Sequence, residues 1–155
     1  MVSFHHDFER WKRESEPAGC PVCQGQPSPA HHVDIKEFAT SWLCAHPRVC
    51  LWGTCYLLVK PHAVELYDLN ADDLLSYMKE AQVSTRVLKR VTDAVKINYE
   101  IHGNTAPHMH LFPRYLDDPF PGRSIDYDGT EPAVYKEGEF AEFIRRMKEE
   151  LARLV

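Results

Sequence analysis

The sequence predicts an α+β fold built on an antiparallel sheet. Short stretches of strand-like residues dominate the middle of the chain, several with apolar residues at every second position. One long stretch with helical spacing lies among them, and amphipathic helical patterns lie at both ends. Strands in the middle and helices at the ends indicate an α+β arrangement. A chain of 155 residues fits one domain with a sizeable core.

The first elements are a short helix and three strands. Phe4, Phe8 and Trp11 form one stripe of a polar amphipathic helix, which ends at the segment 16–19. The apolar run that ends at Val59 is continuous, which favours a central position in the sheet. In chain order the pattern predicts a helix over 4–15, hairpin strands over 33–40 and 41–45, and a strand over 54–59.

A long helix, two strands and a terminal helix follow. Asn70 is suited to cap a helix that continues to about Thr92. Beyond it the pattern predicts strands over 97–101 and 106–112, a loop or arm over 116–136, and a helix with the stripe Phe140, Phe143, Ile144, Met147, Leu151 and Leu154. We expect a single domain over 1–155, with a helix and linker in 1–19 and an arm and helix in 116–155.

Composition and charge exclude several classes of protein. The net charge of −5 argues against nonspecific binding of nucleic acid. No apolar run approaches the ~20 residues that span a bilayer. The first residues lack the basic start and apolar stretch of a signal peptide. We therefore expect a cytoplasmic protein with no membrane partner and no specific nucleic-acid partner. The five cysteines, with Cys20 and Cys23 spaced as Cys-x-x-Cys, favour metal or redox chemistry over a disulfide framework.

The segment His108-Met-His110-Leu-Phe112-Pro-Arg114 carries the strongest functional signal. A period of two places the two histidines, Phe112 and Arg114 on one face of a strand, and Met109 on the other. Two histidines on one face are a poor choice for a core. They suit a nucleophile, a proton relay or a metal site. The lead-in Gly-Asn-Thr-Ala-Pro offers an amide and a hydroxyl, which suit a bound phosphate.

This segment resembles the histidine triad (HIT) family of nucleotide hydrolases and transferases. The family pattern is His-x-His-x-His followed by apolar residues, often Pro-Arg, with Gly-Gln or Gly-Asn and Ser or Thr just before it. Gly103-Asn104-Thr105 and Pro113-Arg114 match both flanks, but only two histidines are present. The resemblance implies a HIT-like fold, a small-molecule nucleotide as substrate, attack of the middle histidine on an α-phosphate, a covalent nucleotidyl-histidine and a homodimer.

Two alignments with the family are open. From the Asn104-Thr105 side, His108 is the first triad position, His110 the second, and Phe112 replaces the third. From the Pro-Arg side, His108 is the second position and His110 the third. The first alignment makes His110 the nucleophile, and it is the one that we favour; the second gives that role to His108. The third histidine is missing in the first alignment, whereas in the second Ala106 stands at the first position. His102 is a candidate proton donor in place of the third histidine.

A second motif of the family supports the first alignment. Many members have a Cys-x-x-Cys pair near the N-terminus and a histidine just after a strand that ends in Lys or Pro-Lys. Cys20, Cys23 and His62 match these places, and the first triad histidine, His108, completes the set. The resemblance therefore implies a Cys₂His₂ site that suits a structural zinc ion.

The resemblance also implies a phosphate-binding set. Asn104 and Thr105 match the lead-in that donates hydrogen bonds to phosphate, and Asn98 matches an asparagine of the preceding strand. Arg114 is equally suited to contact phosphate or to form a structural ion pair. The family's ribose-binding acid has no clean match, because Trp-Leu-Cys-Ala-His-Pro occupies its place at 42–47.

Two other functions compete with this one. The shortened motif is compatible with a nucleotide-binding or zinc-stabilised interaction protein that has little catalysis. Thiol redox chemistry at Cys20 and Cys23 is disfavoured, because a loop and hairpin follow the motif in place of a βαβ unit. We interpret the remaining cysteines as packing residues and the remaining histidines as surface or satisfied polar groups, namely Cys44, Cys50 and Cys55, and His5, His6, His31, His32, His46 and His102.

Overall fold

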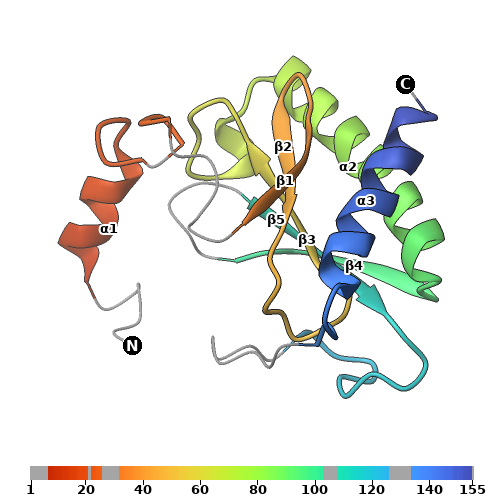
Figure 1. Ribbon diagram of the computed structural model, residues 1–155. Helices are drawn as coiled ribbons and strands as arrows, with labels where there is room; N and C mark the ends of the chain where they lie inside the picture. The colour runs from red at the N-terminus through yellow and green to blue at the C-terminus, as the bar shows by residue number, and fades with distance from the viewer. Residues whose placement is uncertain (1–6, 21, 26–31, 103–107, 126–133, 155) are drawn as a thin grey trace.

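The computed structural model describes residues 7–20, 22–25, 32–102, 108–125 and 134–154. A five-stranded sheet and two long helices form most of this structure (Figure 1). The elements in chain order are α1 (Phe8–Ser15), β1 (Val33–Glu37), β2 (Ser41–Ala45), β3 (Cys55–Val59), the 3₁₀ turn η2 (Leu66–Asp68), α2 (Ala71–Thr92), β4 (Lys96–Ile101), β5 (His108–Arg114) and α3 (Glu139–Ala152). The α+β class predicted from the sequence is confirmed.

The sheet has the strand order β1-β2-β3-β5-β4, and every neighbouring pair is antiparallel. The central position predicted for the run that ends at Val59 is confirmed, because β3 is the third of five strands. β5 lies between β3 and β4, so the strand with the two histidines has a hydrogen-bonded neighbour on each side. The predicted first hairpin is also present, although β1 ends at Glu37, because a turn that joins Phe38 to Ser41 follows it.

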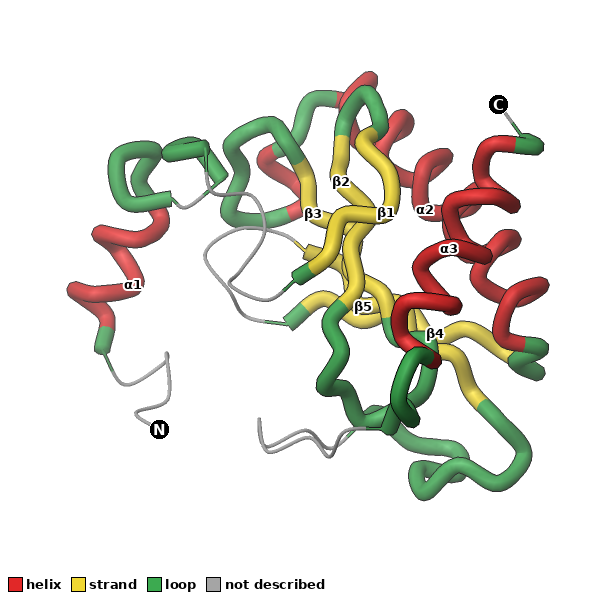
Figure 2. Tube along the Cα trace, viewed as in Figure 1, coloured by secondary structure: helices red, strands yellow, loops and turns green. Residues whose placement is uncertain are grey.

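One face of the sheet is covered by α2 and α3, which lie side by side in Figures 1 and 2. We call this side the helical face. Alternate residues of the strands point into this layer and form the main core with both helices. The core includes Leu43, Leu57, Met109 and Leu111 from the strands, Val87 and Leu88 from α2, and Phe143 and Met147 from α3. The opposite side, which carries His108, His110 and Phe112, is the histidine face.

The long helix begins and ends as its sequence predicts. The side chain of Asn70 accepts hydrogen bonds from the backbone N–H groups of Asp72 and Asp73, which caps α2 at its first turn. The helix ends at Thr92 and is followed by Asp93 in the left-handed region, with φ of 56°. α3 spans the predicted stripe from Phe140 to Leu151, whereas Leu154 lies beyond its end.

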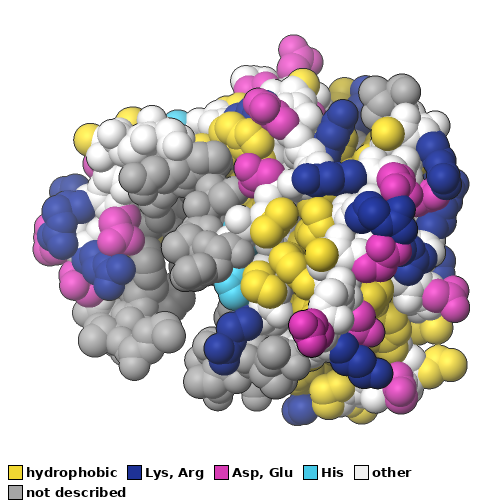
Figure 3. All heavy atoms as spheres, viewed as in Figure 1, with side chains coloured by type: hydrophobic (Ala, Val, Ile, Leu, Met, Phe, Trp, Pro, Cys, Tyr) yellow, Lys and Arg dark blue, Asp and Glu magenta, His cyan; other side chains and the backbone are white. Residues whose placement is uncertain are grey.

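The outer surface of α3 carries both positively and negatively charged side chains. Figure 3 shows Lys and Arg side chains interleaved with Asp and Glu side chains over this part of the molecule. Arg145 forms ion pairs of 2.5 Å with both Glu142 and Glu149, all three about half exposed. This pattern belongs to a solvated helix surface.

α1 stands apart from the helices that cover the sheet (Figure 1) and has no buried residue. Asp7 caps it through a hydrogen bond from the N–H of Arg10, and the rings of Phe8 and Trp11 stack 5.9 Å apart. Phe4, the first member of the predicted stripe, lies outside the described residues. Among the residues described, no helix is long and apolar enough to cross a membrane.

Candidate active site on the histidine face

His110 lies at the middle of the histidine face. It is opposite Tyr56 on β3 and opposite Glu100 on β4, so its side chain shares a face with both. Only 5% of the residue is exposed. Four rings surround the imidazole, with centroids 4.4 to 5.4 Å from its own: His102, His108, Tyr56 and Phe112. The predicted alternation of β5 is confirmed, because Met109 and Leu111 belong to the core of the helical face.

Neither ring nitrogen of His110 has a hydrogen-bond partner among the described residues. Burial, followed by the nearby imidazoles of His108, His102 and His32, lowers the pKa of His110 to about 3. The imidazole is therefore neutral near pH 7 and has a free lone pair, as a nucleophile requires. Buried polar atoms nearly always have a hydrogen-bond partner in proteins. Two ring nitrogens without a partner among the described residues therefore indicate a candidate functional residue.

Strand β4 contributes a second row of polar side chains to the histidine face. Asn98, opposite Phe112, donates a long hydrogen bond of 3.4 Å to Glu100. The other oxygen of Glu100 lies 3.2 Å from Nε2 of His102. The ring of His102 stacks on that of His110, with centroids 4.4 Å apart and an angle of 21° between the planes.

His102 is a satisfied polar group, as expected, because its ring nitrogen is paired with Glu100, and its ring also lies against that of His110. His32 likewise has ring contacts, with Tyr56 at 5.0 Å and His46 at 5.1 Å. Glu100 is a further polar residue at this site, and it was not among the residues predicted from the sequence. The signal for it was its place on the polar side of the alternating strand 97–101, which the antiparallel pairing sets opposite His110.

Phe112 occupies the position of the missing histidine in the first alignment. It is 1% exposed, and its ring stacks on His110 with centroids 5.4 Å apart. Behind it lie Leu51 and Ile125, which form a small apolar cluster with it. The third position of the motif thus supplies packing to the imidazole and no proton-carrying group.

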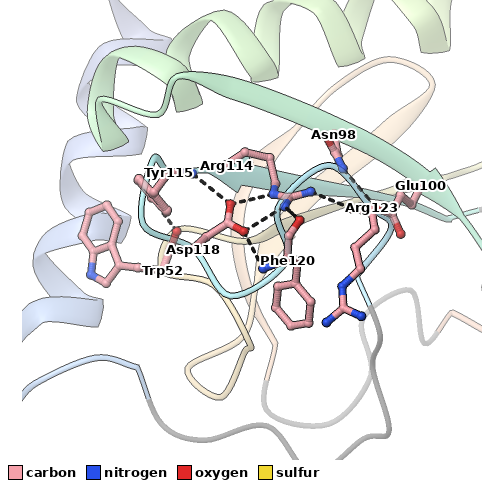
Figure 4. A network of polar contacts seen from close by, with 8 residues as sticks. All are labelled: Trp52, Asn98, Glu100, Arg114, Tyr115, Asp118, Phe120 and Arg123. Carbon is pink, nitrogen blue, oxygen red and sulfur yellow. Dashed lines mark hydrogen bonds and ion pairs between the residues drawn. The ribbon is translucent and has the colours of Figure 1, made fainter.

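Arg114 forms an ion pair within the chain. Its guanidinium donates to both carboxyl oxygens of Asp118, at 2.7 and 2.8 Å, and to the backbone oxygens of Phe120 and Arg123 (Figure 4). All three of its nitrogens are therefore engaged with the loop that follows β5. This pairing lowers the pKa of Asp118 to about 2. Of the two roles expected for Arg114, the structure displays the ion pair.

Three of the four expected zinc ligands lie together. The ligand atoms of Cys20, Cys23 and His62 are all within 4.8 Å of one another, and Sγ of Cys23 is 3.1 Å from Nδ1 of His62. Two thiols and an imidazole at this spacing fit zinc. His108 is outside this group of three. It lies opposite Leu58 near the end of β3, and His62 follows that strand after three residues.

Other expected residues have different outcomes. Asn104 and Thr105 lie outside the described residues. Cys44 and Cys55 are fully buried and Cys50 packs against the Phe112 cluster, so their interpretation as packing residues is confirmed.

Several solved structures of histidine triad proteins share this fold. One from Bradyrhizobium japonicum has a TM-score of 0.69 and 23% identity, over 78% of this chain and 91% of its own. One from Marinobacter aquaeolei has a TM-score of 0.68 and 20% identity, over 81% and 93%. A Zn-bound family protein from Mycobacterium smegmatis has a TM-score of 0.59 and 21% identity, over 87% and 92%. No protein-family model and no curated protein matches the chain. The fold of this chain is therefore that of the histidine triad proteins, as the sequence resemblance implied.

Proposed function

We propose that this protein is a nucleotide phosphohydrolase or nucleotidyl transferase that acts at an α-phosphate through a covalent adduct on His110. The observation that carries the proposal is the buried, neutral imidazole, whose two nitrogens have no hydrogen-bond partner among the described residues. A buried polar atom without a partner costs about 1–3 kcal/mol. A ligand or reaction partner that binds the nitrogen is the best explanation for a histidine that bears this cost at the centre of a sheet face.

The chemistry has two balanced steps. One ring nitrogen of His110 attacks the α-phosphorus, and the bond from phosphorus to the leaving atom breaks, which is an oxygen in a nucleotide ester or anhydride and a nitrogen in a phosphoramidate. The leaving atom takes the electron pair. Water then attacks the same phosphorus, the phosphorus–nitrogen bond breaks, its electron pair returns to the imidazole, and one proton of the water passes to the solvent. Another hydroxyl in place of water gives nucleotidyl transfer. The developing charge on the phosphate oxygens requires donors, and Asn98, Asn104 and Thr105 are the residues that we assign to this role.

A poor leaving group also needs a proton. Phe112 cannot supply it, whereas His102 lies against the nucleophile and contacts Glu100. We assign proton donation to His102, with Glu100 as its positioning residue. We expect His102→Gln to slow adduct formation about 10²-fold or more with an alkoxide leaving group, which is the usual scale of general acid catalysis, and to change it little with p-nitrophenolate. Equal losses with both leaving groups would contradict the assignment.

Zinc would be held by Cys20, Cys23 and His62, with His108 as the fourth ligand. Partial desolvation and then the neighbouring Cys20 raise the pKa of the Cys23 thiol, so binding of a metal ion here releases a proton. Such a site would join the segment after α1 to the end of β3 and, through His108, would orient one end of β5. Its role in this proposal is structural.

Mass spectrometry after incubation with adenosine 5′-phosphoramidate, together with zinc analysis, tests the proposal. Wild type is expected to gain one adenylyl group on His110 and to contain one zinc ion. His110→Gln is expected to lose the adduct and keep the zinc, whereas His108→Gln is expected to lose the zinc. An adduct that survives in His110→Gln and disappears in His108→Gln with the zinc intact would favour the second alignment.

The alternative is a nucleotide-binding protein with little catalysis. Phe112 in the third position favours it, because a proton-carrying group is replaced by a packing group. Nucleotide binding by wild type without any adduct, even with the activated p-nitrophenyl ester of AMP, would support the binder and contradict the enzyme.

We also propose a homodimer through the edge of the sheet at β4. This strand ends the sheet, and large apolar side chains are exposed on it and on α2: Tyr99 and Ile101, and Leu75 and Met78. An exposed edge of this kind is a template for pairing. Sedimentation is expected to give a dimer for wild type and a monomer for Ile101→Lys; a monomeric wild type would contradict the proposal.

A further inference from the structure

We propose that a groove beside Asn98 binds a phosphate-bearing leaving group, such as the pyrophosphate part of a nucleoside triphosphate. The groove lies between the ends of β4 and β5 and the loop 115–124, and it has a volume of about 450 Å³. It is large enough for several phosphate groups. The assignment rests on the reaction proposed above for His110, and it adds a second contact region for the same substrate.

The charges in the groove favour an anion. Arg114 and Asp118 both line it, but they neutralise each other in a two-fold hydrogen-bonded pair. Lys96 and Arg123 line it as well, and neither has an ion pair among the described residues. Two positive charges therefore remain uncompensated within the lining. Ser124 adds a hydroxyl, and Asn98 adds an amide at the end nearest the active site.

The groove is placed next to the reacting atoms. Asn98 lines it and is opposite Phe112, whereas Glu100, two residues further along β4, is opposite His110. Two residues of a strand span roughly 7 Å. The groove thus begins at Asn98, which is two residues along β4 from the residue opposite the nucleophile. From there it continues along β4 towards Lys96, on the side of β5 that faces away from β3. A phosphate chain attached to an α-phosphate over His110 could follow this path.

The wall that carries Arg123 is fixed before any ligand binds. The backbone oxygen of Arg123 accepts a hydrogen bond of 3.0 Å from Arg114, and Asp118 accepts bonds from the N–H groups of Tyr115 and Phe120 (Figure 4). The hydroxyl of Tyr115 donates to the backbone oxygen of Trp52 at 2.7 Å. The loop is therefore held at several points, which reduces the entropy that anion binding would cost.

Calorimetric titration of the zinc-loaded protein with inorganic pyrophosphate tests the groove without any catalysis. Relative to wild type, the double variant Lys96→Gln/Arg123→Gln is expected to bind pyrophosphate at least about ten-fold more weakly, since each lost charge-assisted bond weakens binding by that order. The control Lys79→Gln/Arg86→Gln removes two exposed cations from α2 and is expected to bind like wild type. No binding by wild type, or equal binding by the two double variants, would overturn the proposal.

Adduct formation separates this proposal from the reaction itself. With ATP, the Lys96→Gln/Arg123→Gln variant is expected to show a raised KM for single-turnover adduct formation. With the p-nitrophenyl ester of AMP, whose leaving group has no phosphate, its KM is expected to match wild type. Normal labelling with the ester and no pyrophosphate binding would overturn the groove and leave the reaction intact. Pyrophosphate binding that needs both cations, without any adduct, would support the groove and contradict the reaction.

Discussion

Glu80 and His110 are buried polar residues on opposite sides of one sheet, and they differ in their hydrogen bonding. The carboxyl group of Glu80, on the helical side, accepts hydrogen bonds from the N–H of Thr40 at 2.9 Å and from the hydroxyl of Ser41 at 2.6 Å. The two nitrogens of His110, on the histidine face, have no partner among the described residues. Glu80 is 8% exposed and His110 5%, so burial does not distinguish them.

The difference distinguishes polar groups that stabilise the fold from polar groups that the fold only keeps in place. Glu80 joins α2 to the turn between β1 and β2, and Tyr77 joins the same helix to β3 through a bond of 2.6 Å to the oxygen of Leu57. Both are satisfied within the chain. His110 makes no such link to any part of the chain that the structure describes, so burial of its polar atoms costs free energy without stabilising the fold. The following variants test this contrast, from the largest expected change in stability to the smallest.

Loss of the Glu80 side chain is expected to have the largest effect. Glu80→Ala leaves the N–H of Thr40 and the hydroxyl of Ser41 without their acceptor in a buried place. We expect the free energy of unfolding to fall by about 3 kcal/mol in urea denaturation. Lys79→Ala, at an exposed position one residue earlier, is the control and is expected to change stability by less than about 0.5 kcal/mol. Similar small changes in the free energy of unfolding of both variants would show that Glu80 does not stabilise the fold.

The ion pair between Arg114 and Asp118 should contribute a pH-dependent part of the stability. Because Arg114 lowers the pKa of Asp118 to about 2 from 3.8, the contribution is fully present above pH 4 and is lost as the pH falls towards 2. Asp118→Asn should therefore be about 2 kcal/mol less stable than wild type at pH 6, with a difference that shrinks between pH 4 and pH 2.

The neighbouring Asp117→Asn is the matched control for this pair. Asp117 is exposed, and it is adjacent to Asp118 in the same loop. Its variant is expected to follow the wild-type pH curve. A difference between Asp118→Asn and wild type that stays constant down to pH 2 would show that the carboxyl charge is not involved.

Removal of the Tyr77 hydroxyl is expected to have a smaller effect. Tyr77→Phe keeps the ring in the core and deletes one hydrogen bond to the oxygen of Leu57. We expect a loss of about 1 kcal/mol in the free energy of unfolding, with adduct formation unchanged. A loss of the adduct at unchanged stability would place function on the helical side and weaken the contrast.

The sequence predicted the fold well because local signals determine most of it. The cap at Asn70 and the period of α2 define that helix, and the alternation in β4 and β5 sets which side chains share a face. These are properties of neighbouring residues, so they are visible without tertiary information. The boundary of β1 was less accurate, because the turn before Ser41 depends on Glu80, about 40 residues away.

The site was predicted in part for a related reason. Cys20, Cys23 and His62 were brought together by the resemblance to a known pattern, although 39 residues separate Cys23 from His62. Glu100 and the contact of His102 with His110 depend on the register between β4 and β5, which periodicity alone does not fix. The bond between Arg114 and Asp118 depends on how the loop after β5 returns to the strand.

Urea unfolding of zinc-loaded His110→Phe measures most directly the free-energy cost of burying the imidazole of His110. Phenylalanine keeps a planar ring between Tyr56 and Phe112 and removes the two nitrogens for which the described residues offer no partner. If His110 is kept for its reaction, the variant should be more stable than wild type by about 1 kcal/mol and should form no adduct. If the variant is instead less stable by the amount expected for Glu80→Ala, His110 supports the fold and the central claim is wrong.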